Sequence, residues 1–73
     1  MIALIAGTFQ EAESFIRGVK KRERKKYVYM SCVDKARGIE WEDVVLTGTP
    51  FMRKDFQELM VSVSRYMNYK RSL

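Results

Sequence analysis

The sequence predicts a small α/β domain, in which a three-stranded and mostly parallel sheet carries two helices in the order β-α-β-β-α. Three observations lead to this prediction. Continuous apolar runs alternate with segments of helical periodicity, a pattern typical of strands that helices bury on both faces. Capping and turn residues separate these segments. The chain has 73 residues without a recognisable repeat or linker, so we expect one domain spanning residues 1–73.

Residues 2–19 predict the first strand and the first helix. Ile2 to Ala6 is an uninterrupted apolar run that ends at Gly7, as expected of a buried strand. Thr8 and Glu11 have the capping-box spacing, in which the hydroxyl and the carboxylate each accept a hydrogen bond from a free backbone amide at a helix start. Apolar side chains then recur on one helical face, at Ala12, Phe15, Ile16 and Val19.

The rest of the chain predicts two further strands and a second helix. Tyr27 to Val33 is apolar and should form a strand parallel to the first, while Asp43 to Leu46 should form a third, with a strand order of 2-1-3. The roughly ten residues between them leave the direction of the third strand open. Either Thr49 or Asp55 could cap the second helix. Its apolar positions are Phe56, Leu59, Met60, Val63 and Met67.

Composition excludes much familiar chemistry. The chain has no histidine and a single cysteine, Cys32, which we expect to be inert packing within the second strand. Disulfides, histidine-based zinc sites and nucleophiles activated by imidazole are therefore excluded. We predict no catalytic residue, no cofactor and no metal site, so the protein is expected not to be an enzyme. The opening segment is too short and uncharged for a leader or a membrane span, which predicts a cytoplasmic protein with no membrane partner.

Positive charge is concentrated in residues 17–26. The segment RGVKKRERKK has seven basic side chains and one acidic one, a local balance of +6, whereas the whole chain carries +5. We expect the first helix to continue through this segment, so that Arg17, Lys20, Lys21 and Arg24 share one side at spacings of three and four residues and could contact phosphates. The alternative is a solvated helix end that the helix dipole favours. The residues predicted to bind nucleic acid here are Arg17, Lys20, Lys21, Arg24 and Lys25.

Residues 34–40, D-K-A-R-G-I-E, give a second signal. Between two apolar strands, this string resembles motif V of superfamily 2 helicases, with a spacing one residue shorter. Residues 2–16 look like motif IV, so the chain resembles an abbreviated second RecA-like domain of those enzymes. The resemblance implies a parallel third strand and a contact role for Asp34, Arg37 and Gly38, with Glu40 as a further candidate. Glycine allows close backbone approach, and arginine forms a fork that matches phosphate.

The departures from that family are large. The chain has no G-x-x-x-x-G-K-[ST] phosphate loop, lacks the strand and helix expected between motifs IV and V, and has no arginine-bearing motif VI. ATP hydrolysis is therefore not expected. The alternative interpretation makes Arg37 and Gly38 a turn before the third strand, with Trp41 capping the core.

The predicted function is a non-catalytic binding module whose partner is nucleic acid or a protein that works on nucleic acid, as in a compact viral or mobile-element protein. The alternative is a protein–protein interaction module or a homodimer, such as a viral modulator of a host protein, without nucleic-acid contact. Aromatic residues near the cations do not decide between them. Tyr27 and Tyr29 alternate along one side of the second strand and are expected to form a packing layer. Cations and rings interleave again at Arg65, Tyr66, Tyr69, Lys70 and Arg71.

Overall fold

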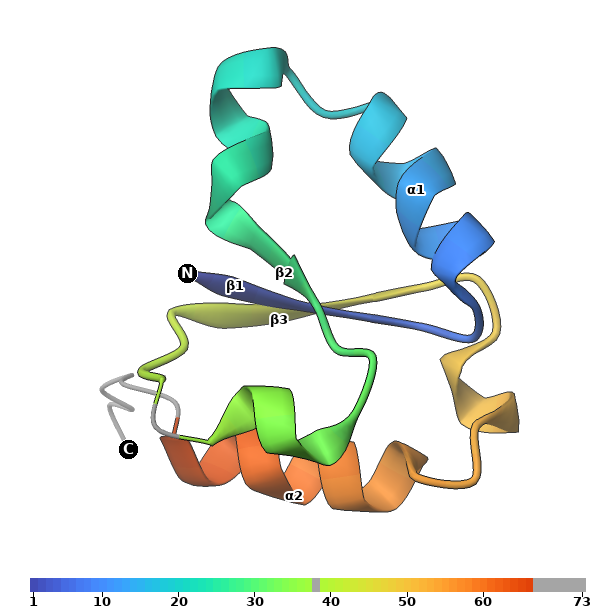
Figure 1. Ribbon diagram of the computed structural model, residues 1–73, viewed down its shortest axis with the longest axis vertical. Coiled ribbons are helices and arrows are strands. Elements are labelled where there is room, and N and C mark those ends of the chain that lie inside the picture. The colour runs from blue at the N-terminus through green and yellow to red at the C-terminus, as the bar shows by residue number, and fades with distance from the viewer. Residues whose placement is uncertain (38, 67–73) are drawn as a thin grey trace, which may run out of the picture.

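The computed structural model describes residues 1–37 and 39–66 and shows a three-stranded parallel sheet (Figure 1). The strands are β1 (Ile2–Ala6), β2 (Tyr27–Tyr29) and β3 (Asp43–Thr47). Their order is β2-β1-β3, and β1 pairs in parallel with both neighbours. The predicted α/β class and strand order are confirmed. The third strand, whose direction the loop length left open, is parallel.

One helical layer covers each face of the sheet (Figure 1). Helix α1 (Phe9–Arg17) lies on one face, and α2 (Phe56–Tyr66) lies on the other together with the short 3₁₀ helix η2 (Val33–Ala36). Side chains alternate along β1, so that Leu4 faces α1 while Ala3 and Ile5 face α2. All three are fully buried. The central strand therefore belongs to two apolar clusters, one on each side.

Helix α1 begins as predicted but ends earlier. The Thr8 hydroxyl accepts a hydrogen bond from the Glu11 amide at 3.2 Å, which fixes the helix start. The helix ends at Arg17, and Gly18 is its C-cap. A separate 3₁₀ helix, η1 (Lys21–Lys26), follows. The prediction of one continuous helix through this segment was wrong, because glycine weakens a helix and like charges three and four residues apart repel one another on it.

Strand β2 is shorter than the predicted strand over residues 27–33. The Met30 amide still donates to the Leu4 carbonyl at 2.9 Å, after which the chain leaves the sheet. Cys32 is the N-cap residue of η2 and is exposed, so its prediction as buried packing was wrong. The apolar run is continuous in sequence, but only its first part belongs to the sheet. Val33 and Ala36 pack on the α2 face instead of extending the strand.

Of the two starts proposed for the second helix, the later one is the start of α2. Thr49 is the N-cap residue of a single 3₁₀ turn, η3 (Pro50–Met52), and α2 begins separately at Phe56. Leu59 and Val63 are buried, as expected. Phe56 and Met60 pack against the same cluster, and Met67 lies outside the described residues.

The aromatic residues of β2 form the predicted packing layer. The rings of Tyr27 and Phe15 meet edge to face with centroids 5.4 Å apart, and those of Tyr29 and Phe9 at 5.8 Å. Both tyrosines therefore pack against α1. Among the described residues, no helix has the length and apolar character needed to cross a membrane.

Candidate nucleic-acid interface

The basic segment forms the turn and the 3₁₀ helix that lead from α1 into β2 (Figure 1). In a 3₁₀ helix, residues three apart eclipse one another, unlike in the α-helix assumed from the sequence. Helix η1 consequently presents three rows of side chains. These rows are Lys21 with Arg24, Arg22 with Lys25, and Glu23 with Lys26.

Arg24 holds η1 against the end of α1. Its Nε donates to the Val19 carbonyl at 2.9 Å, and its Nη2 donates to the Arg17 carbonyl at 3.1 Å. The last carbonyls of a helix lack intrahelical partners, so this guanidinium satisfies groups that the early end of α1 leaves free. These two bonds give Arg24 a positioning role, and its predicted phosphate contact stays a prediction.

The single acidic residue of the segment is paired within η1. Lys26 Nζ lies 2.6 Å from Glu23 Oε2, one 3₁₀ turn away. The hydrogen bond to Glu23 and the charge of that carboxylate raise the pKa of Lys26 above its ordinary value. Glu23 therefore offsets Lys26 and leaves the other cations of the segment without an acidic neighbour in η1.

Apart from Lys26, which pairs with Glu23, five cations of the segment are exposed and form what we call the basic patch. Within residues 1–37 and 39–66, none of them pairs with an acidic side chain. The patch consists of Arg17, Lys20, Lys21, Arg22 and Lys25. Arg22 was not among the predicted residues, because on a continuous α-helix it lies away from the side shared by Arg17, Lys20, Lys21 and Arg24. The glycine that follows Arg17 was the available sign that the helix would end.

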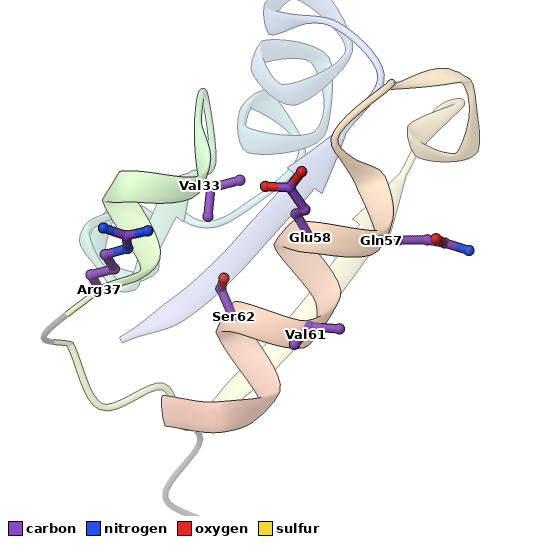
Figure 2. Close-up of a pocket in the computed structure, with 6 residues that line it drawn as sticks. All are labelled: Val33, Arg37, Gln57, Glu58, Val61 and Ser62. Atoms are coloured by element: carbon purple, nitrogen blue, oxygen red, sulfur yellow. The ribbon is translucent and has the colours of Figure 1, made fainter.

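The structure places Arg37 on the other face of the sheet, beside α2 (Figure 2). Its Nη1 lies 3.6 Å from Asp34 Oδ1, and both side chains are largely exposed. Gly38 lies outside the described residues. Arg37 borders an open pocket of about 340 Å³ between η2 and α2. The other lining residues are Val33, Gln57, Glu58, Val61 and Ser62.

The two parts of the predicted site are therefore separated by the sheet. Helix η1, which carries most of the basic patch, lies on the α1 side (Figure 1), whereas Arg37 lies beside α2 on the other side (Figure 2). Trp41 follows this loop, is fully buried, and donates from its indole Nε1 to the Ala36 carbonyl at 3.2 Å. The alternative interpretation, in which Trp41 caps the core, is confirmed for that residue.

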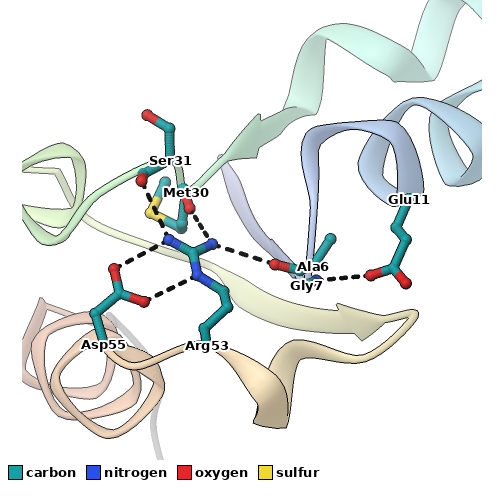
Figure 3. A network of polar contacts seen from close by, with 7 residues as sticks. All are labelled: Ala6, Gly7, Glu11, Met30, Ser31, Arg53 and Asp55. Carbon is teal, nitrogen blue, oxygen red and sulfur yellow. Dashed lines mark hydrogen bonds and ion pairs between the residues drawn. The ribbon is translucent and has the colours of Figure 1, made fainter.

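The carboxyl ends of parallel strands are the usual ligand position in α/β sheets, and here the protein's own side chains fill it (Figure 3). The Glu11 carboxylate accepts hydrogen bonds from the Gly7 amide at 2.8 Å and the Thr49 amide at 3.0 Å. The Thr49 hydroxyl lies 3.2 Å from Oε2 of the same carboxylate. The pKa of Glu11 is lowered by these hydrogen bonds. The bond from the Thr49 amide has the largest effect, followed by those from the Thr49 hydroxyl and the Gly7 amide.

Arg53 joins the same ends from the other side (Figure 3). Its Nη1 donates to the Ala6 carbonyl at 3.2 Å and the Met30 carbonyl at 2.6 Å, and its Nη2 donates to the Ser31 carbonyl at 3.1 Å. Both Asp55 carboxylate oxygens accept from the same guanidinium, at 2.9 and 3.0 Å. All five N–H groups are engaged. Arg53 therefore ties the strand ends together and is not available to a ligand.

Comparison of the chain with protein-family models, with curated proteins and with solved structures finds no match. Charge and geometry consequently identify the candidate site. Of the surfaces described, the basic patch is the one where five exposed cations lie within nine consecutive residues, none of them paired with a described acidic side chain.

Proposed function

We propose that this protein is a non-catalytic module that binds nucleic acid through the basic patch. The supporting observation is that five exposed cations lie within nine consecutive residues, 17–25, while the one acid among them is paired with Lys26. Nucleic acid is the common cellular polyanion whose affinity depends on such a cluster.

Binding would proceed through phosphates. The ammonium groups of Lys20, Lys21 and Lys25 act as point charges, and the guanidinium groups of Arg17 and Arg22 can each donate two parallel hydrogen bonds to one phosphate. Contact releases condensed counterions, which supplies the favourable free energy. Phosphate contacts position a protein but do not read bases, so we expect weak sequence preference.

The phosphate contact predicted for Arg37 from the helicase-like segment would be separate from the contacts of the basic patch. Since Arg37 lies across the sheet from the basic patch, a duplex held by the patch would not reach it. We expect Arg37→Glu alone to change affinity for a short duplex by less than about twofold, the loss expected from one distant charge.

Salt dependence tests the proposal. If about three phosphates are contacted, the logarithm of the binding constant should fall with the logarithm of salt with a slope of about −2.7, or about 40-fold between 50 and 200 mM. Fluorescence anisotropy of a labelled short duplex measures this slope. The triple variant Lys20→Glu/Lys21→Glu/Lys25→Glu should abolish binding.

A matched control separates the patch from overall charge. Lys35→Glu/Lys54→Glu/Arg65→Glu reverses the same number of exposed cations elsewhere on the chain. Retained binding by this control, with loss in the patch variant, supports the proposal. Equal losses in both variants would show only a general charge effect, and wild-type protein that fails to bind at low salt would refute nucleic-acid binding.

A second candidate function is protein–protein interaction, which exposed apolar side chains favour. Phe51 and Met52 of η3 are 71% and 81% exposed, and Phe9 at the start of α1 is 59% exposed. These residues follow the carboxyl ends of β3 and β1. Large exposed apolar groups mark protein interaction sites. Recovery of a partner from native cells that persists after nuclease treatment and at high salt would favour this function over nucleic-acid binding.

A further inference from the structure

The outer edge of β3 is open in the described part of the chain. The strand order places β3 at one side of the sheet, where Asp43–Thr47 pairs with β1 only. Its apolar side chains are incompletely covered, since Val44 and Val45 are half-buried and Leu46 is 40% exposed. An open edge presents backbone donors and acceptors to another strand.

The structure shows which backbone groups face outward. The Val44 amide donates to its neighbour's carboxylate, Asp43 Oδ1, at 2.8 Å, and therefore does not point toward β1. Backbone N–H and C=O groups alternate in direction along a strand, so those of Leu46 also face outward. The groups of Asp43, Val45 and Thr47 face β1, in agreement with the register that pairs Val45 with Leu4.

We propose that β3 pairs antiparallel with β3 of a second copy of this chain, so that two protomers share one six-stranded sheet. The register centred on Val45 uses all five residues of the strand. Val44 then lies opposite Leu46 of the second copy. The Val44 amide gives up its bond to Asp43 Oδ1, and the two residues exchange two backbone hydrogen bonds. The twofold axis repeats that pair. Leu46, exposed in the monomer, becomes covered by the facing Val44.

The strand sequence D-V-V-L-T favours a second copy as the occupant. Antiparallel pairing about Val45 places each Asp43 opposite Thr47 of the second copy, so the two carboxylates lie at opposite ends and a hydroxyl donor faces each one. The apolar side chains meet in the middle. Parallel pairing would instead place the two Asp43 carboxylates close together at the same end of the interface.

Such a dimer would also affect nucleic-acid binding. This consequence rests on the proposed function, whereas the dimer itself does not. A twofold axis perpendicular to the sheet keeps both α1 helices on the same face. Because η1 leads into β2, at the side of the sheet away from β3, the two basic patches lie at opposite ends of that face. Five strand spacings separate the outer strands by about 24 Å. One nucleic acid could then engage both patches, which raises apparent affinity without new contacts.

Sedimentation equilibrium without nucleic acid tests the dimer itself. Wild-type protein should dimerise, and Leu46→Pro should weaken the dimer at least about tenfold, because proline removes an outward N–H that β1 does not use. Leu46→Ile retains that N–H and should dimerise like wild type. Circular dichroism checks that each variant folds. A wild-type chain still monomeric at about 1 mM would overturn the proposal, since it leaves less than about 4 kcal/mol for association.

A disulfide assay tests the register and does not depend on the proline variant. In a Cys32→Ser background, Val45→Cys faces itself across the twofold axis with Cα atoms about 4.5 Å apart, within the range for a disulfide. Leu46→Cys is more exposed but faces Val44, so it should crosslink more slowly. Equal or faster crosslinking of Leu46→Cys would overturn the register. Failure to bind nucleic acid would leave both assays unaffected, so the two proposals fail separately.

Discussion

Replacing Arg53 should destabilise the fold more than replacing any other charged side chain described. The Arg53 side chain is only 10% exposed, and its five N–H groups bond to the ends of β1 and β2 and to Asp55. Arg53→Ala leaves the Ala6 and Met30 carbonyls without these donors and leaves Asp55 unpaired. The substitution therefore breaks several contacts between segments that are distant in sequence.

The magnitude follows from burial. Removing one partner of a buried ion pair costs about 3–5 kcal/mol, and Asp55 is 32% exposed, so the lower end of about 3 kcal/mol applies. A 73-residue domain has a total stability of about 4–11 kcal/mol, so the loss is a large fraction of it. Arg53→Lys keeps the charge but cannot reproduce the planar fork, and should cost about 1–2 kcal/mol.

Urea unfolding followed by fluorescence measures these changes. Trp41 is the single tryptophan and is fully buried, so its emission reports the loss of the core. Lys54→Ala is the matched control, since Lys54 is exposed and adjacent in sequence, and it should change stability by less than about 0.5 kcal/mol. The reasoning is refuted if Arg53→Ala is as stable as this control. In a double-mutant cycle, Arg53→Ala and Asp55→Ala should couple by at least about 1 kcal/mol.

Three further predictions concern the same strand ends and η2. Because the pKa of Glu11 is lowered from its ordinary 4.5 in the folded state, its stabilisation is present above pH 4.5 and is lost as the pH falls through the folded value. Urea midpoints of Glu11→Gln should therefore depend less on pH below 4.5 than those of wild type, and parallel curves would contradict this. Gly48→Ala should destabilise by at least about 1 kcal/mol in the same assay, because Gly48 has φ of +68° and an added Cβ would meet the Glu11 carboxylate. Gly18→Ala, where the added Cβ would lie 3.5 Å from the Phe15 carbonyl in an ordinary helical conformation, is the control and should be tolerated. Cys32 should react with a thiol reagent in the native protein about as fast as in urea, and strong native protection would contradict its exposed position at η2.

Local patterns predicted the elements that depend on local physics. The apolar run of β1 and the hydroxyl of Thr8 specify a buried strand and a helix start through neighbouring residues alone, and both are found. The parallel pairing of the first two strands followed from the helix that connects them. The C-terminal end of α1 was missed, because hydrophobic periodicity does not show how strongly Gly18 and the repulsion among cations destabilise the helix.

Sequence alone established a concentration of positive charge in residues 17–26 and the absence of histidine chemistry, since composition does not depend on the fold. Tertiary structure decided which cations are available: Arg24 is engaged by backbone carbonyls, Arg22 joins the patch, and Arg37 lies across the sheet. It also decided the role of Arg53, whose carbonyl partners lie 22 to 47 residues away. Contacts between residues so far apart in sequence arise only when parallel strands bring their carboxyl ends to one edge of the sheet. No local pattern of residues could therefore have predicted them.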